Sequence, residues 1–176
     1  MRLMPDKSAP CSELEMQDQV AEYLSQRKFE SSDPKDRYYG NRISPKIYRE
    51  IAIPNVGRIS DIIVFISDRR IVNIECKMIN YSEVIKQAQD HLIWADYSYV
   101  CFYAETYLPT YELKKLIENG IGLLLWKPEI FVEVIQSKYN RNINKVIREN
   151  VIKILRKKDH LKKGLIESEC QQNLYD

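Results

Sequence analysis

Two short runs rich in β-branched residues constrain the fold more than any other feature of the chain. The first, SDIIVFI, covers residues 60–66, and the second, IVNIECKM, covers residues 71–78. Only the four residues 67–70 separate them, which is the spacing of an antiparallel β-hairpin. Residues 82–94 then repeat apolar side chains at helical spacing, and residues 97–103 again have a strand pattern. A hairpin followed by a helix and another strand is typical of a mixed α/β sheet.

The rest of the chain adds helices and strands around this hairpin. The patterns predict helices over 12–29, 110–119 and 142–158, and strands over 47–53, 121–126 and 130–135. Ser12 and Ser82 are the expected N-caps of their helices, and Gly120 is the expected end of its helix. Residues 31–41 form a predicted polar loop, and residues 54–57 a predicted turn. The predicted order, α-β-β-β-α-β-α-β-β-α, is an α/β fold with a mixed central sheet flanked by helices.

Length and composition limit the class of protein. The chain has 176 residues, 44% of them hydrophobic, which fits one domain with a substantial core. No apolar run approaches the ~20 residues of a membrane helix, and the N-terminus lacks the apolar segment of a secretory signal. The four cysteines form no CxxC pair and the two histidines lie far apart in sequence, which argues against a zinc site or a disulfide framework. We therefore expect a reduced, soluble, cytoplasmic protein with no membrane partner.

Charge is distributed unevenly along the chain. Residues 1–140 carry a net charge of −2, residues 141–163 carry +7, and the remaining tail carries −3. We expect one domain over 1–140, with a basic C-terminal helix and tail over 141–176 packed on the same domain. Basic segments of this kind bind polyanions, although charge runs also occur as plain solvated helix faces. We expect this helix to lie next to the catalytic site, and its candidates for phosphate contacts are Lys153, Arg156, Lys157 and Lys158.

Charged residues of the predicted hairpin indicate a site. Side chains two apart on a strand share a face, so Glu75 and Lys77 project together, while Ile74 and Cys76 point into the apolar side. The first strand of a hairpin begins beside the end of the second, so Asp61 and Glu75 can meet at one end of the sheet. Two carboxylates and a backbone carbonyl suit Mg²⁺ or Mn²⁺. A neighbouring lysine can orient or deprotonate a water and stabilise charge on a phosphate, which suits phosphodiester hydrolysis.

This pattern resembles that of a known family of nucleases. Asp61, followed after 13 residues by Glu75-Cys76-Lys77, resembles the PD-(D/E)xK nuclease superfamily, which includes type II restriction enzymes, Holliday-junction resolvases and RecB-like exonuclease domains. The resemblance covers residues 12–126 and implies a restriction-endonuclease-like core. It implies that Asp61 and Glu75 bind Mg²⁺ or Mn²⁺, that the Cys76 carbonyl is a further ligand, and that Lys77 contacts the attacking water. The implied enzyme is a Mg²⁺-dependent endo- or exodeoxyribonuclease acting on DNA, with RNA as an alternative substrate.

The same resemblance suggests outer members of the site. Gln87, on the helix after the second strand of the hairpin, matches a glutamine that RecB-like members place near the site, and His91 stands where a tyrosine often follows. A solvated helix-face glutamine is an equal interpretation of Gln87. Glu13 is the best-placed glutamate of the first helix for a metal ligand, although others on that helix compete and stabilisation of the helix dipole is an alternative role. Glu50 is another outer carboxylate, and Ser60 stands in place of the family's proline.

Two other functions stay open on the sequence alone. A non-catalytic nucleic-acid-binding module within a repair or phage-defence assembly would bind DNA with a steep salt dependence and no turnover. A protein-interaction subunit would use the basic helix to dock an acidic partner. The intact set of Asp61, Glu75 and Lys77 favours the nuclease. Because cutting both strands with one site per chain favours two protomers, we expect a homodimer or a larger nuclease complex.

Overall fold

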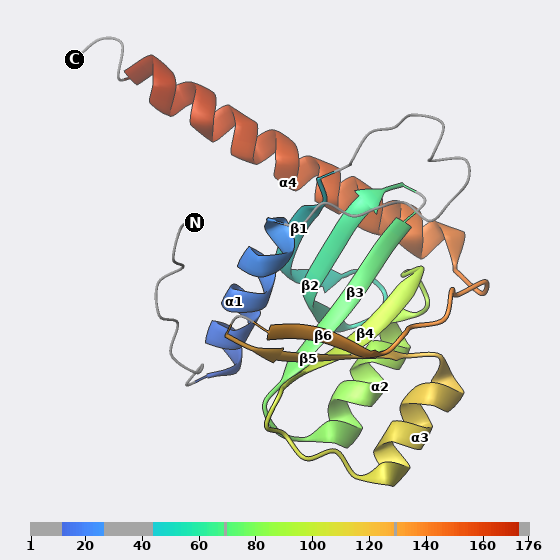
Figure 1. Ribbon diagram of the computed structural model, residues 1–176. Helices are drawn as coiled ribbons and strands as arrows, with labels where there is room; N and C mark the ends of the chain where they lie inside the picture. Colours follow the sequence, from blue (N-terminus) through green and yellow to red (C-terminus); the bar gives the residue numbers. More distant parts are fainter. Residues whose placement is uncertain (1–11, 27–43, 69, 129, 173–176) are drawn as a thin grey trace, which may run out of the picture.

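A computed structural model describes residues 12–26, 44–68, 70–128 and 130–172, with side chains described up to residue 160. The predicted loop over 31–41, and the end of the first predicted helix beyond residue 26, lie outside the described residues. The elements are α1 (Glu13–Ser25), β1 (Lys46–Ile53), β2 (Arg58–Ser67), β3 (Arg70–Lys77), α2 (Tyr81–His91), β4 (Tyr97–Tyr103), α3 (Thr110–Asn119), β5 (Gly122–Lys127), β6 (Ile130–Ile135) and α4 (Lys145–Gln172) (Figure 1). The predicted order of helices and strands is confirmed.

One six-stranded sheet organises the molecule, and its strands lie side by side in chain order. The strands β1, β2 and β3 are antiparallel, β3 is parallel to β4 and β4 to β5, and β6 is antiparallel to β5. The predicted hairpin is therefore confirmed, with Ile62 paired to Ile74. The helices α2 and α3 are the crossovers that the two parallel connections require. The fold is a mixed α/β sheet flanked by four helices, as predicted.

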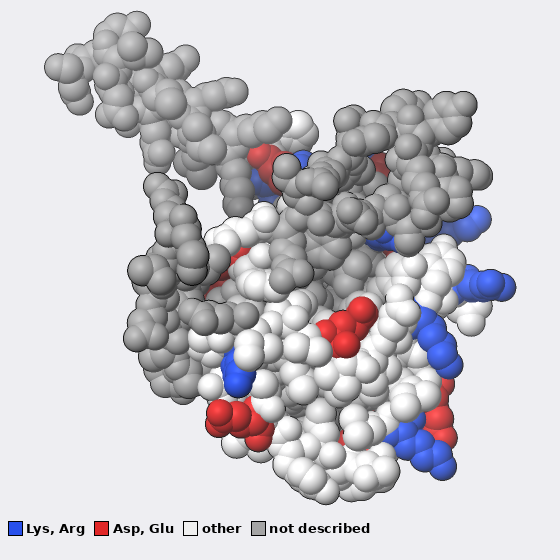
Figure 2. Space-filling view, viewed as in Figure 1, with Lys and Arg blue, Asp and Glu red and all other residues white. Residues whose placement is uncertain are grey.

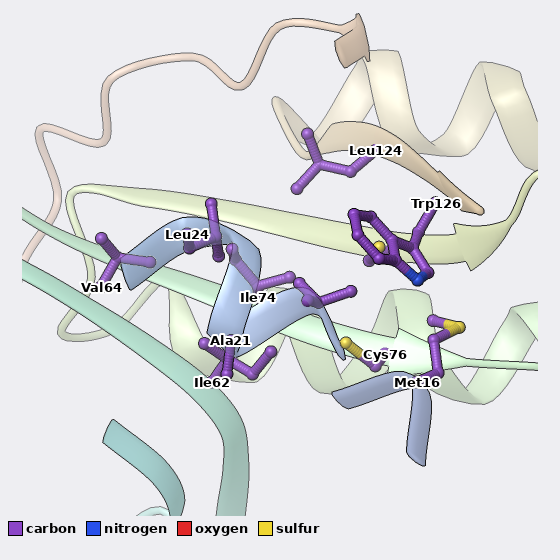
Figure 3. Close-up of a cluster of buried hydrophobic side chains, with 11 residues drawn as sticks. Met16, Ala21, Leu24, Ile62, Val64, Ile74, Cys76, Leu124 and Trp126 are labelled. Carbon is purple, nitrogen blue, oxygen red and sulfur yellow. The ribbon is translucent and has the colours of Figure 1, made fainter. Parts of the chain in front are cut away.

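The helix α1 covers one face of the sheet. Its buried residues, Met16, Val20, Ala21 and Leu24, pack on an apolar layer from β2 to β5 (Figure 3). That layer comprises Ile62, Val64, Ile74, Cys76, Cys101, Leu124 and Trp126. Cys76 is wholly buried there, so its side chain belongs to the core. Because Ile74 and Cys76 face α1, their neighbour Glu75 faces the other side of the sheet.

The other face of the sheet carries α2, α3 and α4. Val151 and Leu155 of α4 are fully buried against a cluster that includes Ile63 of β2 and Trp94. The helix α4 begins at Lys145 rather than at residue 142 and continues to residue 172 instead of 158. The later start follows from a cap that the sequence pattern did not reveal: the Asn144 side-chain oxygen accepts from two backbone N–H groups of the first turn. No helix of the described part is long and apolar enough to span a membrane.

Two of the three predicted helix caps are confirmed. Ser12 caps α1, its hydroxyl oxygen accepting from the Glu15 N–H at 3.1 Å, and Gly120 ends α3 with a φ of 70°. The prediction that Ser82 caps α2 is wrong. Asn80 occupies that position with a φ of 76°, a conformation that asparagine tolerates, so the helix begins one residue earlier. Ser82 instead lies within the helix, and its hydroxyl donates to Glu112 of α3 at 2.8 Å.

Candidate active site

The candidate site lies at the carboxyl end of β3, just before α2. In open α/β sheets, ligands bind outside the carboxyl ends of parallel strands. Asp61 and Glu75 are the next residues beyond the Ile62–Ile74 pair, so they lie side by side on neighbouring strands. The Cys76 N–H donates to Asp61 Oδ2 at 2.8 Å and holds that carboxylate beside β3. The structure therefore brings Asp61 and Glu75 together, as the hairpin pattern predicted.

A break in strand alternation adds a third carboxylate. Tyr48 and Ile51 are three residues apart in β1, yet both are buried in the same cluster, where regular alternation would separate them. The break falls at Glu50, whose φ is 50°. The strand pairs on either side place Glu50 opposite Asp61. A positive φ at a non-glycine residue costs ~1–3 kcal/mol, and such residues cluster at functional sites. The strained residue Glu50 thus lies at the same end of the sheet as Asp61 and Glu75.

Lys77 and Glu13 complete the group from two elements. Lys77 Nζ lies 2.8 Å from Glu13 Oε1, and both side chains are partly buried. Glu13 lies in the first turn of α1, and the buried apolar side chains of α1 pack that helix on the sheet. Burial lowers the pKa of Lys77, but the bond to Glu13 and the nearby negative charges outweigh it, so the net shift is upward. Lys77 is therefore a fixed positive charge beside the two carboxylates.

Glu75 is the most perturbed carboxyl group of the site. Its side chain is 1% exposed. Burial and, to a lesser degree, the charge of Asp61 raise the pKa of Glu75 to about 8, because hydrogen bonding from Asn73 and the charge of Lys77 oppose the shift only in part. A buried carboxylate with this balance lacks enough positive charge around it.

Asp61 shows the same deficit to a smaller degree. The pKa of Asp61 is raised to about 6, because burial and the charges of Glu13 and Glu50 together outweigh the Cys76 N–H and Lys77, which lower it. Protons or a divalent cation would relieve this concentration of negative charge. The donor set thus fits a hard cation such as Mg²⁺, which binds through one or two carboxylates and keeps several waters.

The described side chains do not by themselves enclose a metal ion. No group of three or more His, Cys, Asp or Glu side chains in the described part is arranged as a complete metal cage. Asp61 and Glu75 would be the protein's charged ligands, and the Cys76 carbonyl stays a predicted third donor. Glu13, the fourth predicted ligand, is instead bonded to Lys77 in this structure. Water and substrate oxygens would have to supply the other positions of the ion.

The two predicted residues of α2 differ in how closely they approach the site. His91 is wholly buried, and its Nε2 lies 3.3 Å from Glu75 Oε1. Gln87 is half-buried and lies one turn earlier on the same helix face. The structure therefore places His91 directly at Glu75 and Gln87 farther along α2.

Sequence reasoning missed a buried polar chain behind Glu75. Ser60 Oγ donates to Asn73 Oδ1 at 2.5 Å, and Asn73 Nδ2 donates to Ser98 Oγ at 3.1 Å. Ser98 Oγ in turn donates to the Ala88 carbonyl at 2.8 Å, which ties β2, β3 and β4 to α2. The available signal was Asn73 itself, an amide two residues before Glu75 in an otherwise apolar strand. The same chain gives a structural role to Ser60, whose hydroxyl begins it.

The basic helix is not next to this site, contrary to our expectation. Lys153, Arg156, Lys157 and Lys158 are all exposed, but Arg156 forms an ion pair with Asp68 in the turn between β2 and β3. That turn is at the opposite end of β3 from Glu75, about 17 Å away along the strand at ~3.3 Å per residue. Figure 1 shows α4 crossing the sheet near this turn and continuing past β1. Apolar contacts and the Arg148–Asp96 ion pair, which net charge does not reveal, fix this position.

Comparison with known proteins finds a similar fold but no function. No family model matches the chain, and no curated protein matches it. Among solved structures, the fold is similar to that of the SPO1766 protein of unknown function from Silicibacter pomeroyi, with a TM-score of 0.50 and 19% sequence identity, over 73% of this chain and 80% of that chain. At this identity the likeness concerns the fold alone.

We expect the Glu75→Gln variant to be more stable than wild type at pH 8 in the presence of EDTA. A carboxyl whose pKa is raised on folding loses stability as pH rises from its unfolded value, near 4.5, through its folded value of about 8. Glutamine cannot ionise and avoids that loss. We expect a gain of about 4 °C in Tm, or ~1–2 kcal/mol, that shrinks toward pH 5.

The measurement is thermal unfolding followed by circular dichroism at pH 5, 6.5 and 8. Glu118→Gln is the matched control, because that glutamate is 60% exposed on α3 and pairs only with Lys114 across one helical turn among the contacts described. An equal gain at all three pH values would contradict ionisation of Glu75 as the cause.

Proposed function

We propose that the chain is a metal-dependent nuclease with a restriction-endonuclease-like core, of the PD-(D/E)xK type, that hydrolyses phosphodiester bonds of DNA. One observation carries this proposal. A buried carboxylate, Glu75, and a half-buried one, Asp61, lie together at the carboxyl end of β3 with too little positive charge around them, and Lys77 of the same strand stands beside them. A purely structural hairpin gains nothing from this arrangement, because buried carboxylates without adequate partners are costly.

Each residue has a definite role in this chemistry. Asp61 and Glu75 would hold Mg²⁺ or Mn²⁺ at the sheet end. When bound, the cation would supply positive charge that offsets the phosphate charge, and it would lower the pKa of the water that it binds. Lys77, which stays protonated, would orient the attacking water and stabilise charge on the phosphate rather than act as a base. Glu13 would restrict the Lys77 side chain to this position through their ion pair.

The first experiment is a cleavage assay on plasmid, linear and branched DNA and on single-stranded RNA. We expect cleavage with Mg²⁺ or Mn²⁺ and none with EDTA. Binding of DNA without cleavage in either metal would favour the second candidate, a non-catalytic nucleic-acid-binding module on the same fold. The incomplete metal cage of the described residues is the observation that favours that candidate. If the protein neither cleaves nor binds nucleic acid, the protein-interaction subunit is the favoured candidate.

The basic face of α4 provides a separate test of nucleic-acid binding. Figure 2 shows that, in the view of Figure 1, the basic side chains of the described residues lie mostly along one edge of the molecule, while uncharged atoms and a few acidic side chains occupy the visible front. The exposed lysines of α4, on the other sheet face, are the better candidates. Arg156, which lies among these lysines on α4, pairs with Asp68 in the turn about 17 Å from Glu75, a distance shorter than the ~34 Å of one duplex turn.

We expect Lys153→Ala/Lys157→Ala to weaken duplex binding and to reduce the salt dependence of the binding constant. Each lost phosphate contact lowers the magnitude of the slope of log K against log salt by about 0.9, so the double variant should lose about 2. Fluorescence anisotropy from about 50 to 200 mM salt measures this slope. Lys114→Ala, at a 77% exposed lysine of α3, is the control that should leave the slope unchanged. An unchanged slope in the double variant would exclude α4 from the interface.

A further inference from the structure

His91 lies in a buried position beside the candidate metal ligand Glu75. Burial keeps the His91 ring away from water, with 0% of the residue exposed. Its Nδ1 accepts a hydrogen bond from Trp94 Nε1 at 3.0 Å, and the two rings pack edge to face at 5.4 Å between centroids. Trp94 is itself fully buried, beneath α4. The orientation of the imidazole is thus fixed from its far side.

The Trp94 contact determines which nitrogen of His91 carries the proton. Indole Nε1–H is only a donor, so Nδ1 of His91 must be the unprotonated acceptor. The neutral ring then carries its hydrogen on Nε2, on the side of Glu75. His91 Nε2 is therefore a hydrogen-bond donor whose identity is set by a neighbour.

Glu75 is the natural acceptor for this donor. Nε2 and Glu75 Oε1 are 3.3 Å apart but poorly aligned, and neither atom has a hydrogen-bond partner among the described residues. The Ile59 carbonyl is the other acceptor near this ring. Buried polar atoms without partners are uncommon in native proteins, and hydrogen bonds at active sites often tighten only when the complete complex forms. At 3.3 Å, Glu75 Oε1 is within hydrogen-bonding distance of Nε2.

We propose that His91 is a positioning residue: its Nε2–H, presented by Trp94, holds Glu75 Oε1 and leaves the second carboxylate oxygen of Glu75 to bind the divalent cation. This inference rests on the proposed function and deepens it, since it specifies how one ligand of that site is oriented. Carboxylates that ligate metals are commonly held by such outer hydrogen bonds, and loss of one weakens metal binding about 10–100-fold.

The test measures Mn²⁺ affinity by electron paramagnetic resonance, with urea unfolding of every variant in parallel. We expect His91→Phe, which has no donor, to weaken Mn²⁺ binding about 10–100-fold, and His91→Gln, whose amide can donate from nearly the same place as Nε2, to stay within about threefold of wild type. Trp94→Phe keeps His91 but frees its tautomer, so its affinity should fall between these two. His160→Gln, at the exposed histidine of α4, should match wild type.

The outcomes separate this inference from the function on which it depends. A merely structural role for His91 would lower the unfolding free energy of His91→Phe without changing Mn²⁺ affinity, and that result would overturn the inference. If His91→Phe does not fold, unchanged affinity in Trp94→Phe overturns it equally. Loss of Mn²⁺ binding in Glu75→Gln together with normal binding in His91→Phe would reject the positioning role alone. Failure of wild type to bind Mn²⁺ at all would reject the metal site and the positioning role together.

Discussion

Single replacement of Asp61, Glu75 or Lys77 by alanine is expected to reduce DNA cleavage by about 10³-fold or more, while the fold is retained. Asp61→Ala and Glu75→Ala each remove one of two charged ligands, and loss of a single group that stabilises developing charge already costs about 10²–10³-fold in rate. Lys77→Ala removes the fixed positive charge beside them. The two carboxylate variants should also lose metal-induced stabilisation against heat, whereas Lys77→Ala should keep most of it.

The measurement is the initial rate of cleavage of the best DNA substrate, with circular dichroism to confirm folding. Glu118→Gln and Lys114→Ala are matched controls, because these two residues form an exposed ion pair on α3. Cleavage at the wild-type rate in all three site variants would refute the nuclease proposal at this site. Loss of cleavage in the carboxylate variants but not in Lys77→Ala would restrict the role of Lys77 to the structure of the site.

The largest effect on stability is expected from Arg148→Met. Arg148 Nη2 lies 2.7 Å from Asp96 Oδ2, and the two side chains are only 13% and 2% exposed. Its guanidinium also donates to the carbonyls of Trp94 and Asp68, so it joins α4 to the sheet and to the turn after β2. Removal of one partner from a buried ion pair leaves the other charge without compensation and costs about 3–5 kcal/mol. For a chain of this size that corresponds to a fall of about 10 °C in Tm.

Urea unfolding compares this variant with Arg141→Met, an exposed arginine just before α4 that should cost little. A loss below about 1 kcal/mol in Arg148→Met would mean that apolar contacts alone hold α4 in place.

The order of elements could be predicted from sequence because each strand and helix has strong local signals. Residues 60–66 and 71–78 are β-branched runs separated by a short connection, and the structure pairs them as the predicted hairpin. The prediction that Ser82 caps α2 failed because a serine's suitability as a cap does not by itself locate the start of the helix. The start depends on the left-handed backbone at Asn80, and the Ser82 hydroxyl bonds to Glu112 instead. The prediction that α4 lies next to the candidate site also failed. Net charge indicates what kind of ligand a helix could bind, but it does not reveal the buried Arg148–Asp96 pair that fixes where the helix lies.

The site was predictable where its residues are close in sequence. Asp61, Glu75 and Lys77 belong to one hairpin, so strand geometry alone brings them together. Glu13 could be proposed from the family resemblance, but its contact with Lys77 depends on how α1 packs across the sheet. Glu50 joins the group through a break in the alternation of β1 that no regular pattern predicts. The link from Trp94 through His91 to Glu75 required the tertiary structure, because its direction depends on which ring nitrogen faces which neighbour.

The chain-order arrangement of the six strands has a consequence for how the protein is made. Every strand pairs with its predecessor in the sequence, so most of the sheet has low contact order, and such topologies fold fast. The distant contacts are those of the two outer helices: Tyr48 of β1 bonds to Asp159 of α4 across 111 positions, and Trp126 of β5 bonds to Gln19 of α1 across 107. We therefore expect the sheet to grow strand by strand during synthesis, at about 5–20 residues per second. The pair of Asp61 and Glu75 would then be assembled seconds before the ribosome has finished the helix that locks the far end of the sheet.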